Sequence, residues 1–149
     1  MADMPYTRVY ASGQNIANAT ENLVYMNTLD TGIQNTTARY GYPMWVAGNT
    51  QLTVQFDGVY AIMAQIAYEA NTTGIRILSI VTGWGGTVKY LGQTLQNAST
   101  AGNHVQQCSA LAYLTQGTVI GVTAYQTSTA TINIIGGSES TWLAAHKVS

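Results

Sequence analysis

The stretch that decides the fold is Thr53–Val81, TVQFDGVYAIMAQIAYEANTTGIRILSIV. Between Val59 and Glu69 its residues alternate between two sets. The even-numbered set is entirely apolar, and it consists of Tyr60, Ile62, Ala64, Ile66 and Tyr68. The odd-numbered set is only partly apolar, and it consists of Val59, Ala61, Met63, Gln65, Ala67 and Glu69. This period of two predicts a long central strand with one fully apolar face.

Turn residues bound this strand at both ends. Asp57-Gly58 precedes it and Asn71-Thr72-Thr73-Gly74 follows it. Ile75–Val81 is rich in β-branched residues and predicts a second strand, joined to the first in an antiparallel hairpin. Further short strands are expected at 23–29, 51–56, 88–94, 105–114, 119–126, 131–135 and 140–148. Strands at this spacing, with no segment of helical period, predict an all-β sandwich or barrel.

Three motifs resemble one family. The first is Gly58-x-Tyr60-x-Ile62-x-Ala64-x-Ile66-x-Tyr68, followed by Asn71-x-x-Gly74-x-Arg76. The second begins Leu114-x-x-Gly117-x-Val119 and continues to Ala124-Tyr125-Gln126-x-Ser128, and the third is Gly136-Gly137-Ser138-Glu139-Ser140-Thr141-Trp142-Leu143. Together they resemble the globular head of complement component 1q and the tumour-necrosis-factor-like jelly rolls, over about Leu23 to Val148. Thr118, Trp142 and Ala144 depart from the Asp, Phe and Gly usual in that family. The resemblance implies an antiparallel jelly-roll β-sandwich that packs in threes.

The chain of 149 residues fits one domain. Residues 1–21 lack sustained periodicity, and 22–149 are expected to form the jelly roll. The first segment is interpreted either as a frayed terminus or as an extended arm that attaches to a neighbour through Tyr6, Val9 and Tyr10.

Charged residues are scarce. They make up 7% of the chain, against about 25% in typical soluble domains. Because obligate interfaces are depleted of charge, this scarcity predicts that much of the surface is buried against other copies. We expect a homotrimer whose interface includes Met63, Gln65, Ala67 and Trp142.

Residues for catalysis or metal binding are also few. His104 and His146 have no second His or Cys at ligand spacing, and Gly83-Trp84-Gly85-Gly86 lacks the Lys of a phosphate loop. Cys108 is single, so no internal disulfide can form. We expect no enzymatic activity, no metal and no cofactor.

Two isolated charges, Glu69 and Arg76, lie in apolar strands. They are predicted to pair either across the hairpin or between subunits. Trp84 and Tyr90 flank glycine loops, and they are interpreted either as loop packing or as an outward surface that binds a receptor or glycan.

The net charge of −1 and the absence of a basic run favour neither nucleic acid nor an anionic membrane as a partner. The sequence shows no signal peptide, no collagen-like stalk and no membrane-spanning run. Small versions of this fold rich in Thr, Asn, Gly and Ala resemble virion proteins of tailed bacteriophages. The sequence therefore favours a structural virion protein: a head decoration, a head fibre or a tail-tip knob that contacts other virion proteins. The alternative is a module that binds a host receptor or surface glycan.

Overall fold

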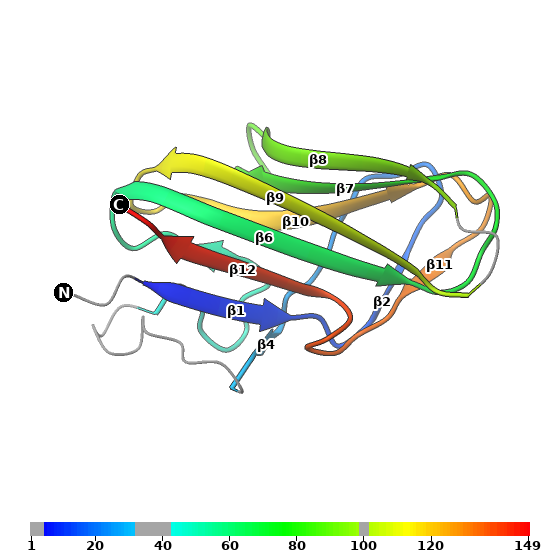
Figure 1. The fold of residues 1–149 in the computed structure, drawn as a ribbon, viewed down its shortest axis with the longest axis horizontal. Coiled ribbons are helices and arrows are strands. Elements are labelled where there is room, and N and C mark those ends of the chain that lie inside the picture. The colour runs from blue at the N-terminus through cyan, green and yellow to red at the C-terminus, as the bar shows by residue number, and fades with distance from the viewer. Residues whose placement is uncertain (1–4, 32–42, 99–101) are drawn as a thin grey trace.

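The computed structural model of the chain describes residues 5–31, 43–98 and 102–149, which form two antiparallel β-sheets packed face to face (Figure 1). Sheet A contains β1 (Tyr6–Tyr10), β2 (Gln14–Ile16), β4 (Thr28–Leu29), β6 (Gly58–Tyr68), β9 (His104–Leu114), β11 (Ile132–Ile134) and β12 (Trp142–Lys147). Sheet B contains β3 (Asn22–Leu23), β5 (Leu52–Thr53), β7 (Ile75–Thr82), β8 (Lys89–Asn97) and β10 (Val119–Gln126). The predicted all-β antiparallel sandwich is confirmed.

β6 is the central strand of sheet A, as its alternation predicted. Its even-numbered side chains, from Tyr60 to Tyr68, are each at most 1% exposed. β9 pairs with β6 along its whole length on one side, and β12 pairs with residues 60–65 on the other. The buried side chains pack against Leu78 and Ile80 of β7 and against the inward face of β10, so the apolar core lies between the two sheets.

The expected hairpin between residues 59–69 and 75–81 is wrong. β6 belongs to sheet A, whereas β7 belongs to sheet B and pairs with β8 and β10. The turn around Asn71–Gly74 therefore carries the chain from one sheet to the other. Gly74 has φ +79°, and the backbone of Thr127 lies directly against it, so a side chain at this position would collide with the end of β10.

The N-terminal residues are part of the sandwich and not a projecting arm. β1 lies between β12 and β4, with Tyr6 opposite His146 and Tyr10 opposite Trp142. β2 pairs with β11. Val9 is completely buried in the core, so it cannot attach to a neighbouring protein. The predicted boundary after residue 21 is corrected accordingly; residues 1–4 lie outside the described part of the chain.

β8 and β9 are edge strands that lie next to each other along one side of the sandwich (Figure 1). Within the described residues, β8 pairs only with β7 and β9 pairs only with β6. At Gly92, a Cβ atom would lie 2.7 Å from the carbonyl oxygen of Ser109, so the absence of a side chain permits this close approach. Exposed edges of this length require cover, because their unpaired backbone groups invite association.

Candidate self-association surface

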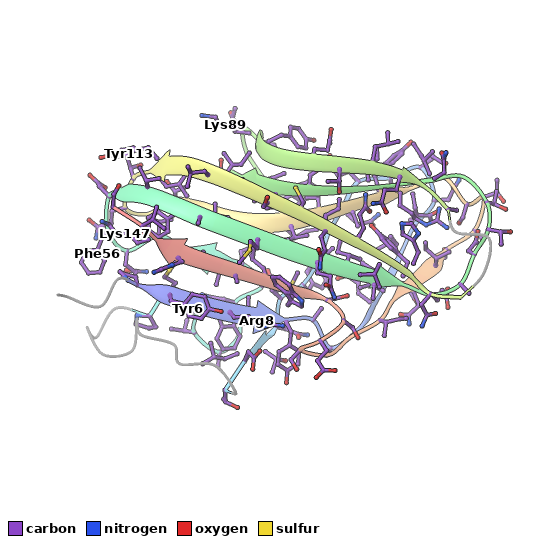
Figure 2. All side chains as sticks on the ribbon, in the orientation of Figure 1. Tyr6, Arg8, Phe56, Lys89, Tyr113 and Lys147 are labelled. Atoms are coloured by element: carbon purple, nitrogen blue, oxygen red, sulfur yellow. The ribbon has the colours of Figure 1, made fainter. Side chains whose placement is uncertain are left out.

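The outward-facing residues of β1, β6, β9 and β12 form a continuous surface, which we call the outer face of sheet A. The strand register places them in rows across the sheet. They are Tyr6, Arg8, Tyr10, Val59, Ala61, Met63, Gln65, Ala67, Val105, Gln107, Ser109, Leu111, Tyr113, Trp142, Ala144 and His146. Of this set, Arg8 alone carries a permanent charge. Figure 2 shows Tyr6 and Arg8 on β1 and Tyr113 on β9, at opposite borders of this face.

Large apolar side chains are exposed on this face. Met63 is 51% exposed, Val105 52%, Tyr113 66% and Leu111 70%. Leu111 pairs with Ala61, and Tyr113 pairs with Val59, so the exposed groups adjoin further apolar atoms. A contiguous apolar surface of this kind is typical of a protein–protein interface.

The four residues that the sequence predicted for the interface differ in how far their side chains are exposed. Met63 is exposed and Trp142 is partly exposed, so both present surface to a partner. Gln65 is only 9% exposed and Ala67 only 4%, so both form the floor of the face. The amide nitrogen of Gln65 donates to the carbonyl oxygens at positions 139 and 140, 2.8 and 2.9 Å away. Its oxygen accepts a 2.8 Å hydrogen bond from Gln107.

A groove of about 450 Å³ crosses this face and continues over the β9 edge. Met63 and Trp142 line it on sheet A, and Gln93 and Thr94 line it on β8. Gln107, Cys108 and Ser109 line it on β9. The groove is large enough to receive a side chain from another molecule, and none of the described residues that line it is ionised.

The single charge on the face is largely neutralised within the subunit. The guanidinium of Arg8 lies 4.5 Å from the centre of the Trp142 ring and pairs with Asp30, with 3.4 Å between Nε and Oδ2. It also donates a hydrogen bond to the carbonyl oxygen of Ser138. Beside it, Tyr6 and His146 stack edge to face with 6.0 Å between ring centres, and burial raises the pKa of the Tyr6 phenol.

No family model and no curated protein matches the sequence. Among solved structures, the chain is similar to Eiger TNF from S. frugiperda, with 14% identity, 99% of this chain and 94% of that chain covered, and a TM-score of 0.69. It is also similar to murine APRIL, with 12% identity, 98% of this chain and 100% of that chain covered, and a TM-score of 0.67. The chain has a tumour-necrosis-factor-like jelly-roll fold.

Arg76 lies inside this jelly roll. It is 1% exposed, and its guanidinium donates to the carbonyl oxygens of Asn71, Thr73 and Ile75 over 3.0–3.1 Å. Glu69 instead accepts a 2.7 Å hydrogen bond from the backbone N–H of Asn133. Because β6 and β7 are in different sheets, the cross-strand form of the predicted Glu69–Arg76 pair is wrong. The buried guanidinium instead holds together the turn between the sheets.

Tyr90 and Trp84 occupy different surroundings in the jelly roll. Tyr90 is 49% exposed at the start of β8, and its hydroxyl donates a 2.7 Å hydrogen bond to Glu21. This bond raises the pKa of Tyr90, because it stabilises the protonated phenol. Trp84 is partly buried in the turn between β7 and β8. Glu21 was not singled out from the sequence, since it is a lone carboxylate in a loop.

The described residues offer little for catalysis. No group of three or more His, Cys, Asp or Glu side chains within them could hold a metal ion. Burial raises the pKa of the Cys108 thiol, which keeps it in the unreactive neutral form. In the same part of the chain, no helix is long and apolar enough to span a membrane.

Proposed function

We propose that the chain is a non-enzymatic structural protein that works as a homotrimer. The observation that carries this proposal is the outer face of sheet A, where Met63, Val105, Leu111 and Tyr113 are each at least half exposed. Obligate interfaces bury about 2,000 Å² or more and are more apolar than the remaining surface. The family that the sequence resembles packs in threes, which favours a trimer over other assemblies.

The scarcity of charge supports the same proposal. Five basic and six acidic residues serve a chain whose accessible surface is 7177 Å². Arg76 and Asp30 are buried, so they contribute little to keeping that surface soluble. Self-association removes the apolar face from water and leaves the remaining charges on a smaller exposed area.

Light scattering coupled to size exclusion tests the trimer. At micromolar concentration the expected mass is three times the 15.9 kDa of one chain. A mass of one chain under these conditions would refute the homotrimer. A stable dimer would keep the face as an interface and refute the threefold arrangement.

We further propose that the trimer belongs to the virion of a tailed bacteriophage, as a head decoration, head fibre or tail-tip knob. The Thr-, Asn-, Gly- and Ala-rich composition of this small jelly roll supports this placement. Of the three residues expected to attach the chain, Val9 is buried in the core, whereas Tyr6 and Tyr10 lie on the outer face of sheet A. Purified particles of the encoding phage should contain the chain in mass spectrometry, and particles without it would refute the placement.

The second candidate is a module that binds a host receptor or glycan. It is favoured by the half-exposed ring of Tyr90, which lines a small hollow on the outer face of sheet B. In this case Tyr90→Ala should lower adsorption to host cells while the trimer stays folded. Unchanged adsorption in a folded Tyr90→Ala trimer would refute this candidate.

A further inference from the structure

The hollow beside Tyr90 lies on the outer face of sheet B and reaches β8, where Gln93 also lines the groove described above. The volume of the hollow is about 190 Å³. The liquid volume of roughly six water molecules is similar, so the hollow suits one small ring and not an extended chain. It is lined by Glu21, Ile77, Ser79, Tyr90, Gln93, Thr123 and Tyr125.

The floor of the hollow is a row of polar side chains. The register places Thr123 of β10, Ser79 of β7 and Gln93 of β8 side by side. Ser79 is 2% exposed and Thr123 is 1% exposed, although both point away from the core. The amide of Gln93 donates a 2.9 Å hydrogen bond to the hydroxyl of Ser79. These polar groups are therefore held in fixed orientations before any ligand arrives.

Glu21 forms one wall, and its two carboxylate oxygens are held separately. The hydroxyl of Thr123 donates to Oε1 over 2.8 Å, and the hydroxyl of Tyr90 donates to Oε2 over 2.7 Å. An ionised carboxylate offers about four acceptor positions, so acceptor capacity remains after these two bonds. That capacity suits ligand hydroxyl groups.

Two tyrosine rings border the polar floor. Tyr90 is half exposed, and Tyr125 is partly exposed on the neighbouring row with Ile77. Aromatic rings offer flat apolar faces to C–H groups, while the adjacent carboxylate, amide and hydroxyls serve hydroxyl groups. Among the described residues no basic side chain lines the hollow, and the charge of Glu21 opposes an anionic ligand.

We infer that this hollow binds a single neutral sugar ring, with its C–H face on a tyrosine and its hydroxyls on Glu21 and Gln93. The inference deepens the adsorption role given above as the second candidate and rests on it. Gln93 lines both this hollow and the groove on the outer face of sheet A, so the assembly state is measured separately in the same samples.

Saturation-transfer NMR on the 149-residue chain tests the inference. The probes are the methyl glycosides of glucose, galactose, mannose and N-acetylglucosamine. At least one glycoside should show transfer, and Glu21→Gln should weaken its binding by about tenfold or more because a charged acceptor is lost. Trp84→Ala serves as the control, since Trp84 does not line the hollow, and should leave binding unchanged.

Two further variants keep the test decisive if Glu21→Gln disturbs the fold. Tyr125→Ala and Gln93→Ala alter the border and the floor separately, and both should reduce transfer. No transfer from any glycoside, or transfer unaffected by these variants, would overturn the inference and leave the Glu21 bonds with a purely structural role.

Two controls separate this result from the proposals above. Light scattering on the same samples shows whether the trimer persists, so failure of sugar binding is distinguishable from failure of assembly. A parallel measurement with the same sugar at the end of an oligosaccharide shows whether the ligand is a free sugar or a glycan terminus. Sugar binding without any loss of host adsorption in Tyr125→Ala would support the site and refute the adsorption role.

Discussion

Replacing Leu111 by aspartate should dissociate the trimer without unfolding the subunit. Leu111 is 70% exposed in the single chain, and that exposed portion is what assembly would bury. Burying a whole leucine side chain contributes about 1.5–3 kcal/mol, so burying the exposed portion of Leu111 contributes about 1–2 kcal/mol per subunit. Three copies give about 3–6 kcal/mol, which lowers the trimer association constant by about a hundredfold to ten-thousandfold.

The carboxylate adds a desolvation cost on top of this loss, so the effect of Leu111→Asp should be at least that large. Sedimentation velocity over a range of micromolar concentrations measures the change. Val46→Asp is the matched control, because Val46 is 49% exposed in a loop outside the outer face of sheet A. Leu111→Thr removes apolar area without adding a charge and retains a strand-forming residue, so it tests the loss of apolar contact alone. A Leu111→Asp protein that remains as trimeric as Val46→Asp would refute the placement of the interface.

Two further predictions concern the fold. Gly74→Ala and Gly85→Ala both place a side chain at positive φ, but only Gly74 faces backbone, that of Thr127, whereas nothing lies within 4 Å of Gly85. Gly74→Ala should therefore lower the free energy of unfolding by at least about 2 kcal/mol more than Gly85→Ala, and lower Tm by about 4–8 °C more. Equal Tm values for the two variants would contradict this packing. Burial and the nearby Arg76 lower the pKa of His104 from 6.5 in the folded protein. The unfolded chain therefore binds a proton on His104 more tightly, so the free energy of unfolding should fall as pH drops below about 6.5. Urea unfolding of His104→Gln should show a weaker pH dependence than the natural chain, and equal slopes would disprove a contribution from His104.

Local patterns predicted the long strands β6, β7, β8, β9, β10 and β12 but not their partners. The single strand expected at 23–29 is wrong, because β3 and β4 are separate strands in different sheets. β6 was identifiable because its residues alternate over many positions. β10 was identifiable because it is strongly apolar and bounded by turns. The pairing of β7 with β10 joins Leu78 to Ala124, far apart in sequence. No local signal distinguishes this pairing from a hairpin with β6, so the crossing between sheets was missed.

β1 was missed for a different physical reason. In Tyr6–Tyr10 the buried positions are Thr7 and Val9, while the outward positions include two tyrosines. Because the outward side carries the larger apolar groups, the expected contrast between faces is absent. Glu21 was missed because its hydroxyl partners, Tyr90 and Thr123, are 69 and 102 residues away in sequence.

The position of β12 has a consequence for how the protein is made. β12 lies between β6 and β1, so the middle of sheet A is filled by a strand that is synthesised after the other strands described in that sheet. Until then, β1 has only β4 beside it, and the edge of β6 that pairs with β12 is open over residues 60–65. Non-local pairing of this kind slows folding, and sheet A cannot be completed before β12 has been synthesised. A product terminated before Trp142 would expose the edges of two strands and should aggregate.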